Sequence, residues 1–280
     1  MKMNNKISHF IKVLLLVFIG FIVFAAILFF TFIAPYRATP ILMYHSISNE
    51  EQKSNILSLD KKAFISQMEY LSGHSYKIVP LKTLVQAMRQ GKKIAHNWVV
   101  LTFDDGFRDF YTNAYPVLKT RQFNAAMFVY IDKVGRDENS LTWQDINKLQ
   151  EEGLVDIGTH SLSHASLVCL SPLEARQEIL ESKSIIEERL KRPITFFSYP
   201  FGALNDGIIQ MVKQSGYEAA VGTAYRKGEF KDNDIFILRR VFVSKISKHP
   251  FVFRFMLSGY YIPSREFILR VLNIKTPRGL

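Results

Sequence analysis

Two adjacent carboxylates, Asp104 and Asp105, follow the apolar segment 98–103 and precede Gly106. Two negative charges this close repel each other, and the plainest interpretation is an acidic turn in which one aspartate caps the following segment. A bound cation would remove the repulsion, because one carboxylate would coordinate it while the other stayed ionised at neutral pH as a base. The pair therefore predicts a metal site if further ligands exist elsewhere in the chain.

Such ligands are offered by His160 and His164, which lie four residues apart in the segment GTHSLSHASL. This spacing brings two imidazoles to one side of a helical turn or a tight loop. A lone histidine is usually structural, but two at this spacing after an expected strand favour a metal site. One aspartate with two histidines leaves coordination positions open for water and substrate, which is typical of a catalytic site.

The cysteine content narrows the kind of metal site. The single cysteine, Cys169, excludes an intramolecular disulfide and a cysteine-based zinc cluster. Oxygen and nitrogen donors suit Zn²⁺ and several other divalent ions, so the residue types alone leave the identity of the metal open.

A third histidine, His45, stands far from these residues in the sequence, in the segment LMYHSIS. Taken alone, it fits an ordinary surface or core histidine. If the fold brings it to the mouth of the same site, it can serve as a general acid, because an ordinary histidine pKa of about 6.5 allows proton donation near neutral pH.

Short apolar or β-branched segments alternate with helical patterns along the chain after residue 40. Strands are expected at 41–44, 77–79, 98–103, 125–130, 155–157, 195–199 and 217–221, with one more at 240–244. Helices are expected after the N-cap Asp60 and at 81–89, 114–120, 143–152, 172–191 and 206–215. Ser171 and Glu174 form a capping box at the start of the helix at 172–191.

This alternation indicates parallel β/α units, and seven or eight of them predict an α/β fold, a closed or distorted (β/α) barrel. The chemistry of such barrels lies at the C-terminal ends of the strands. The candidate residues lie at or just past the ends of expected strands, so we expect them at one face: His45, Asp104, Asp105, His160 and 199–202.

The segment 13–34 contains no charged residue and is long enough, as a helix, to cross a hydrocarbon core of about 30 Å. A secretory signal has a shorter apolar region and a small-residue cleavage site, and a core helix of this domain would not be apolar on every face. We therefore expect an uncleaved transmembrane signal anchor at 13–34. Three lysines within 1–12 precede it, and Arg37 is the only basic residue among the next fifteen. The residues at 1–12 are therefore expected in the cytoplasm and the rest outside it, as in a single-pass cell-membrane protein.

The net charge of +11 is concentrated at the two ends of the chain. Residues 13–238 balance 24 basic residues with 24 acidic ones, whereas residues 239–280 carry nine basic residues and one acid, Glu266. This distribution is typical of a membrane-facing protein and argues against a nucleic-acid partner. The segment 249–280 is basic and amphipathic, and it either lies on anionic lipid or covers the bottom of the barrel.

Three motifs, TFDDG at 102–106, HSLSH at 160–164 and YPFG at 199–202, resemble those of the NodB-type polysaccharide deacetylases of carbohydrate esterase family 4. The motif MYHSI at 43–47 resembles the permuted branch that contains the poly-β-1,6-N-acetylglucosamine N-deacetylases. The resemblance covers roughly residues 40 to 245, and we take 38–248 as the catalytic domain. It implies a barrel of the polysaccharide deacetylase type and metal-dependent hydrolysis of an N-acetyl group on an amino sugar.

The resemblance also implies a role for each candidate. Asp104 would be the base that activates water, and His45 the acid that protonates the departing amine. The metal ligands would be Asp105, His160 and His164, with Zn²⁺ favoured among the divalent ions. The backbone N–H of Phe201 would steady the oxyanion.

One position departs from the family pattern. Common members carry an arginine three residues before the position of Phe201, where it orients the catalytic aspartate, and this chain has Ser198 there. Arg239 and Arg240 are candidates for that task, and solvated surface charge is an equally open interpretation of both.

These inferences predict a membrane-anchored N-deacetylase that acts outside the cytoplasm on N-acetylglucosamine units of a polysaccharide. The permuted arrangement favours an exopolysaccharide resembling poly-N-acetylglucosamine, and peptidoglycan is the alternative substrate. An inactive, membrane-tethered polysaccharide-binding protein is a further alternative, which the presence of every implied catalytic side chain disfavours.

Overall fold

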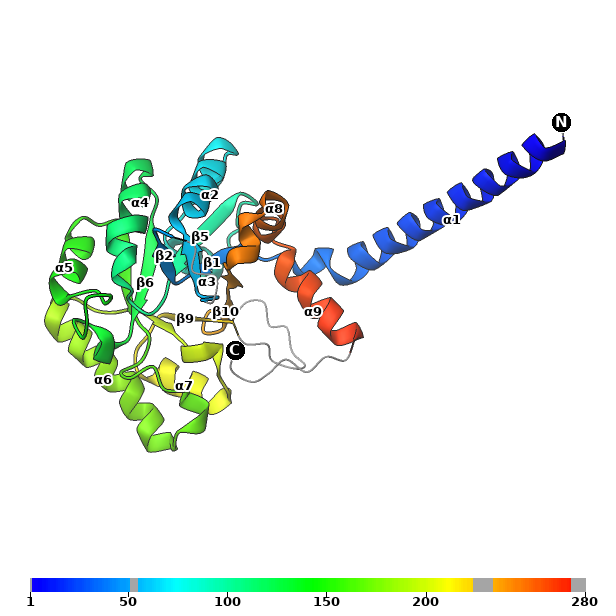
Figure 1. Ribbon diagram of the computed structural model, residues 1–280. Coiled ribbons are helices and arrows are strands. Elements are labelled where there is room, and N and C mark those ends of the chain that lie inside the picture. The colour runs from blue at the N-terminus through cyan, green and yellow to red at the C-terminus, as the bar shows by residue number, and fades with distance from the viewer. Residues whose placement is uncertain (1, 51–54, 224–233, 273–280) are drawn as a thin grey trace.

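The computed structural model describes residues 2–50, 55–223 and 234–272 (Figure 1). Its main sheet is parallel, in the order β10-β9-β8-β7-β6-β5-β1-β11, and β4 pairs with β5 beside this path. The strands are β1 (Ile41–Tyr44), β4 (Lys77–Ile78), β5 (Trp98–Phe103), β6 (Ala125–Val129), β7 (Val155–Thr159), β8 (Phe196–Ser198), β9 (Ala219–Gly222), β10 (Leu238–Arg239) and β11 (Val241–Phe242).

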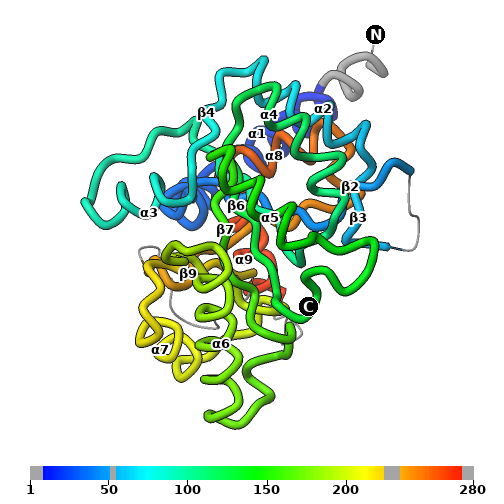
Figure 2. Tube along the Cα trace, turned by 90° about the vertical axis from the view of Figure 1, so that its left-hand side faces the viewer, coloured from blue at the N-terminus to red at the C-terminus, as the bar shows by residue number. Residues whose placement is uncertain are grey.

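Helices surround this sheet, as Figures 1 and 2 show, and the predicted distorted (β/α) barrel is confirmed. The helices that follow the long N-terminal α1 (Lys2–Phe32) are α2 (Lys61–Gly73), α3 (Leu81–Arg89), α4 (Tyr115–Arg121), α5 (Trp143–Glu151), α6 (Pro172–Leu190), α7 (Asp206–Gln214), α8 (Pro250–Leu257) and α9 (Tyr261–Val271).

Local sequence signals set the starts of several helices. The Asp60 carboxylate accepts the Ala63 N–H at the start of α2, and Ser171 and Glu174 form the expected capping box of α6. Each cap satisfies backbone donors that have no partner within the helix. A small parallel sheet of β2 (Ser46–Ser48) and β3 (Ser58–Asp60) also forms, at a place where the sequence pattern predicts no strand.

The middle of the sheet is buried on both faces, which agrees with the apolar composition of β6 and of β5 apart from Thr102. Neighbouring strands pack closely at Gly158 of β7. A Cβ atom there would lie 2.6 Å from the Phe128 ring, so only glycine fits. The packed centre makes a rigid support for the loops at the C-terminal ends of the strands.

The two edges of the sheet meet at the segment 238–242. β10 pairs with β9 and β11 pairs with β1, and only Arg240 separates β10 from β11. The Arg240 N–H donates to the Gly222 carbonyl, and the Val243 N–H donates to the Met43 carbonyl, each at 2.9 Å. We call this segment the seam. It bridges both edges of the barrel and places a single side chain between them.

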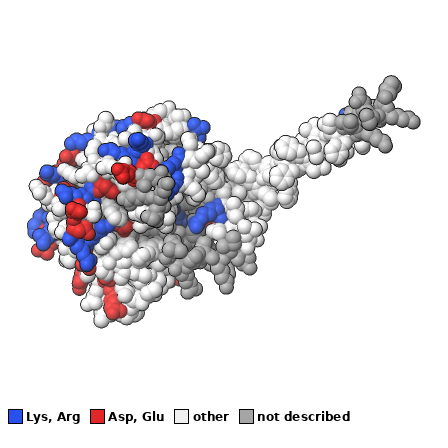
Figure 3. Space-filling view, viewed as in Figure 1, with Lys and Arg blue, Asp and Glu red and all other residues white. Residues whose placement is uncertain are grey.

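The N-terminal helix α1 projects from the barrel and carries almost no charge along its described length (Figure 3). The stretch His9–Tyr36, which begins in α1 and ends in the short turn after it, is long and apolar enough to cross a membrane, by length and composition, and a signal sequence has the same properties. At the other end of the chain, α8 packs on the barrel through Phe253, Met256 and Leu257, which join the main hydrophobic core.

Candidate active site

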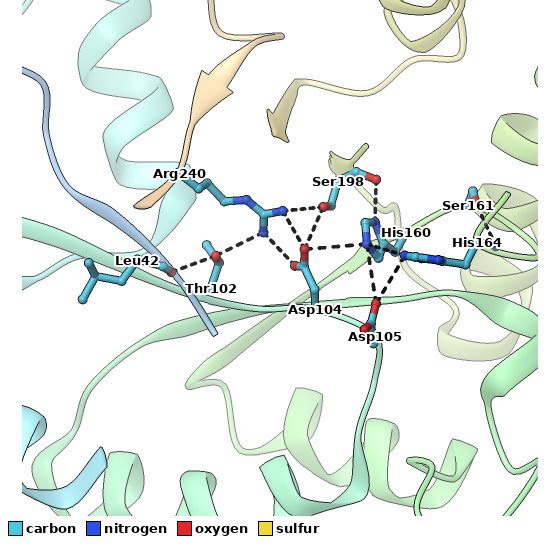
Figure 4. Close-up of polar contacts among 9 residues, drawn as sticks. All are labelled: Leu42, Thr102, Asp104, Asp105, His160, Ser161, His164, Ser198 and Arg240. Atoms are coloured by element: carbon cyan, nitrogen blue, oxygen red, sulfur yellow. Dashed lines mark hydrogen bonds and ion pairs between the residues drawn. The ribbon is translucent and has the colours of Figure 1, made fainter. Parts of the chain in front are cut away.

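The candidate side chains meet at the C-terminal ends of the strands. Asp104 and Asp105 follow β5, His160 follows β7, and Ser198 ends β8. Figure 4 shows Arg240 approaching Asp104 from one side and His160 from the other. In a parallel sheet these strand ends share one edge, so residues far apart in sequence converge there.

Asp104 is held by an ion pair with Arg240. Arg240 Nη1 donates to Asp104 Oδ1 at 2.7 Å, and Nη2 donates to Oδ2 at 2.6 Å. Both residues are buried, with exposed fractions of 4% for Arg240 and 2% for Asp104. This bidentate geometry uses the planar guanidinium fork and fixes the orientation of the carboxylate.

Ser198 completes this arrangement. Its hydroxyl donates to Asp104 Oδ2 at 3.2 Å and accepts a hydrogen bond from Arg240 Nη2 at 2.8 Å. Arg240 Nη1 also donates to the Thr102 hydroxyl at 3.2 Å. The small serine leaves room for a guanidinium that arrives from the seam, so the arginine that orients Asp104 comes from position 240 and not from position 198.

The charge of Asp104 is set by two opposing effects. Burial alone would raise the pKa of this carboxyl, but the charge of Arg240 and its hydrogen bonds overcome that effect and hold the pKa well below its ordinary value. Asp104 is therefore a carboxylate at neutral pH, as a proton acceptor must be.

Asp105, His160 and His164 form a cluster whose possible ligand atoms all lie within 4.8 Å of one another. Asp105 Oδ1 is 3.7 Å from His160 Nε2 and 3.4 Å from His164 Nε2, and the two nitrogens are 3.2 Å apart. Within the described part of the chain, Asp105 Oδ1 is buried and has no hydrogen-bond partner. A buried acceptor facing two imidazole nitrogens fits a divalent cation, which would satisfy all three.

The surroundings of the His160 and His164 imidazoles favour binding of a divalent cation. His160 Nδ1 lies 2.7 Å from the Ser198 carbonyl oxygen, which can only accept, so the proton sits on Nδ1 and the Nε2 lone pair faces the cluster. Burial and the neighbouring His160 lower the pKa of His164 to about 4, so its ring is neutral at neutral pH. Neutral imidazole is the form that binds a metal.

Glu178 of α6 fixes the loop between the two histidines, and the sequence motifs give no signal for it. Its Oε2 accepts the N–H groups of Leu162 and Ser163, each at 2.9 Å, and its Oε1 accepts the Ser163 hydroxyl at 2.5 Å. A carboxylate that accepts three hydrogen bonds restricts this loop and so restricts where His164 can lie.

Strained backbone is concentrated at this site. Four residues with side chains have positive φ here: Asp105 (71°), Ser161 (67°), His164 (64°) and Phe201 (58°). A positive φ raises the free energy of residues other than glycine. It persists only where the surrounding structure holds the backbone in place, as at functional sites. The Ser161 hydroxyl accepts the His164 N–H at 3.0 Å and helps to hold the turn.

His45 lies beside these groups at the end of β1 and is 9% exposed. Burial lowers the pKa of His45, and the charges of Asp104 and Asp105 oppose that shift. Among the described residues, its Nδ1 has no hydrogen-bond partner. The lowered pKa differs from the ordinary value expected from the sequence: His45 is mostly neutral at neutral pH and must take up a proton before it can donate one.

Phe201 lies at the rim, with its ring 4.6 Å from that of His164 and 46% of its surface exposed. Across the ranges that the structure covers, its backbone N–H has no acceptor. The positive φ at Phe201 turns the chain within the YPFG motif and leaves this amide available to a ligand.

The sequence left Arg239 and Arg240 as equal candidates for orienting Asp104, and the structure separates them. Arg239 Nη1 donates to Glu266 of α9 at 2.5 Å, away from the site. Arg240, the next residue, turns into the barrel. Adjacent residues of an extended chain point to opposite sides, so the register of the seam decides which arginine reaches Asp104.

Comparisons with known proteins agree with this geometry. Residues 91–220 match the sequence profile of the family described as polysaccharide deacetylase. YxkH of Bacillus subtilis (strain 168), assigned by its name to the polysaccharide deacetylases, is 32% identical over 205 residues, which cover 73% of this chain and 71% of the relative. A poly-beta-1,6-N-acetyl-D-glucosamine N-deacetylase of Staphylococcus epidermidis is 25% identical over 227 residues, 72% of this chain and 78% of the relative.

Among solved structures, IcaB from Ammonifex degensii superposes with a TM-score of 0.69 at 22% sequence identity. The match covers 79% of this chain and 97% of that one, and it shows a shared fold. Together with the identity and coverage of the Bacillus subtilis relative, the site and the barrel lead to one assignment: the chain belongs to the polysaccharide deacetylase family.

Proposed function

We propose that this protein is a hydrolase that removes N-acetyl groups from N-acetylglucosamine units of a polysaccharide. The observation that carries the proposal is the buried Asp104 carboxylate, oriented by Arg240 and adjacent to the cluster of Asp105, His160 and His164. A fixed base beside a cation site is what hydrolysis of an unreactive amide requires. A polymer of the poly-N-acetylglucosamine type is the favoured substrate because the Staphylococcus epidermidis relative is named for it.

Asp105, His160 and His164 would hold a divalent ion, for which we favour Zn²⁺ because two imidazoles and one carboxylate match its ligand preference. When bound, the ion would polarise the acetyl carbonyl and lower the pKa of a water molecule. The ligand set also leaves room for other divalent ions, which a metal-replacement series distinguishes.

The remaining steps belong to the side chains and backbone of the chain itself. Asp104 would accept the proton of the attacking water, since its carboxylate is ionised and held in one orientation by Arg240. The Phe201 N–H would donate to the oxygen on which negative charge develops. His45 would then donate a proton to the departing amine, which leaves as the neutral amino sugar.

The apolar α1 would anchor the enzyme as a single-pass membrane protein. Lysines precede its apolar segment and few basic residues follow it, which favours a catalytic domain at 38–248 outside the cytoplasm. Residues 1–12 would then form the cytoplasmic tail and 13–34 the membrane span. The basic segment 249–280 would follow the catalytic domain.

The test measures acetate release by the full-length chain in lipid nanodiscs, with poly-N-acetylglucosamine, chitin oligomers and peptidoglycan as substrates. We expect release from the first substrate, its loss on chelation, and its return with Zn²⁺. The variant Asp104→Asn should bind metal normally and release almost no acetate, whereas Asp105→Asn should lose both metal and activity. If the metal-replete protein binds these polymers without releasing acetate, it is a polysaccharide-binding protein and not an enzyme. If it releases acetate preferentially from peptidoglycan, peptidoglycan is the substrate.

A further inference from the structure

The end of α1 lies against the C-terminal helices. Phe29 meets Tyr260 edge to face with 5.1 Å between ring centroids, and Phe32 stacks on Phe267 of α9 at 5.7 Å. Both phenylalanines belong to the apolar segment of α1. If α1 crosses a membrane, Tyr260 and Phe267 therefore lie near the membrane surface from which α1 emerges.

The connection between α1 and the barrel is short and closely packed. The Ala38 N–H donates to the Gly259 carbonyl at 3.0 Å, and Arg37 Nη2 donates to the His96 carbonyl at 2.6 Å. Gly259 has φ +81°, and a Cβ atom there would lie 2.5 Å from the Ala38 carbonyl oxygen. Only glycine allows this approach, which ties the turn between α8 and α9 to the chain leaving α1.

Helix α9 has two different faces. Its barrel face is buried at Ile262, Pro263 and Glu266. Its outer face exposes three aliphatic side chains, with exposed fractions of 52%, 64% and 61% for Ile268, Val271 and Leu272. At 100° per residue, the two sets lie on opposite sides of the helix, so the outer face points away from the barrel.

The part of the chain that contains α8 and α9 is rich in basic residues. Within 245–272 the chain carries five basic residues: Lys245, Lys248, Arg254, Arg265 and Arg270. Its acid, Glu266, is buried and paired with Arg239. Lys248 pairs with Asp60 and Arg254 lies over the Tyr70 ring, so the positive charge on α9 itself comes from Arg265 and Arg270, which complement the anionic headgroups of a lipid surface.

We propose that α9 lies on the surface of the same membrane that α1 crosses, with Ile268, Val271 and Leu272 at the boundary between headgroups and acyl chains. The proposal rests on the proposed anchoring by α1. Single exposed aliphatic side chains are ordinary on soluble proteins, but three on one helix face beside the end of a spanning helix form an interfacial surface. In the view of Figure 1, α9 runs across the direction of α1, as a helix in the membrane plane does.

Site-directed spin labelling of the full-length chain in anionic nanodiscs tests this surface. Cys169 is exposed and is replaced by serine, after which single cysteines are introduced as Ile268→Cys, Val271→Cys, Phe21→Cys and Leu173→Cys. Phe21 reports on the anchor, and Leu173 is an exposed leucine (68%) on α6 that serves as the matched control. Accessibility to oxygen, which enters lipid, is compared with accessibility to a water-soluble nickel chelate.

The expected result is preferential oxygen access at 268 and 271, at a shallower depth than at 21, with preferential nickel access at 173. Lipid contact at 21 with nickel access at 268 and 271 would overturn this inference and leave the proposed anchor intact. Preferential nickel access at all four positions would contradict both the membrane anchoring by α1 and the membrane contact of α9. Low access to both reagents at 268, with spin–spin broadening, would show that a second copy of the chain covers α9 and would also overturn the proposal.

Discussion

Arg240 and Asp104, 136 residues apart in sequence, form a buried bidentate ion pair with donor–acceptor distances of 2.7 and 2.6 Å. The pair joins the seam of the barrel to the carboxylate that we propose as the base. Because a buried carboxylate without its partner costs about 3–5 kcal/mol, the pair matters both for the stability of the fold and for the orientation of Asp104.

Arg240→Lys should lower kcat about 100-fold with little change in KM. Lysine keeps the positive charge but cannot donate two parallel hydrogen bonds, and a base displaced by about 1 Å loses activity on this scale. Steady-state kinetics with Arg239→Lys as the control checks this, because Arg239 pairs with Glu266 outside the site. Unchanged kcat in the Arg240 variant would contradict the proposed orienting role.

Moving the arginine should partly restore activity. We expect Arg240→Ser to be nearly inactive and the double variant Ser198→Arg, Arg240→Ser to be at least about 10-fold more active than it, since the guanidinium would approach Asp104 from the position common in the family. Circular dichroism verifies folding of both variants. A folded double variant with no gain would show that the seam position itself is required.

His45→Gln should lower kcat on the polysaccharide by about 10² to 10⁴, the usual contribution of a general acid. The same variant should retain most activity on an aryl acetate, whose phenolate leaves without protonation. Comparing the two substrates separates proton donation from a structural effect. An equal loss on both would rule out the acid role.

Glu178→Gln should weaken metal binding about 10- to 100-fold, although Glu178 does not belong to the ligand cluster. Its carboxylate holds the loop between His160 and His164 through the Leu162 and Ser163 amides. Isothermal titration with Zn²⁺ measures the affinity, and Glu181→Gln on the same helix is the matched control. If both variants bind Zn²⁺ with equal affinity, the Glu178 carboxylate does not contribute to metal binding.

The metal-free protein should lose stability as the pH falls from about 6.5 to about 4. The folded-state pKa of His164 is about 4, below its unfolded value near 6.5, so in this window the unfolded chain takes up a proton that the folded chain does not. Thermal unfolding of the metal-free protein across this range measures the loss. His164→Gln removes this titration and should give a flatter curve, whereas identical curves would refute the assignment.

Much of the fold could be predicted from local patterns. The helix at Leu81–Arg89 and the strand at Trp98–Phe103 have the expected bounds, because periodicity and β-branched content are local properties. The small sheet of β2 and β3 escaped prediction, since its polar serines resemble a loop and only tertiary pairing orders them.

Some residues of the candidate site could likewise be predicted from the sequence, and others could not. Residues that directly follow strands, such as Asp105 and His160, could be assigned to one face from topology alone. The choice between Arg239 and Arg240 could not be made, because it depends on the register of two short strands paired with distant partners. Glu178 was also missed, since its role arises from a loop that reaches α6 in space.

The seam also bears on how the protein is made. A ribosome that has just completed Asp104 must add 136 further residues before Arg240 exists. Until then the barrel has two open edges, and the carboxylate has no cationic partner from the seam. A nascent chain that does not yet contain the seam therefore cannot hold Asp104 in its paired orientation, and the candidate site assembles only after the seam has been synthesised and has closed the sheet.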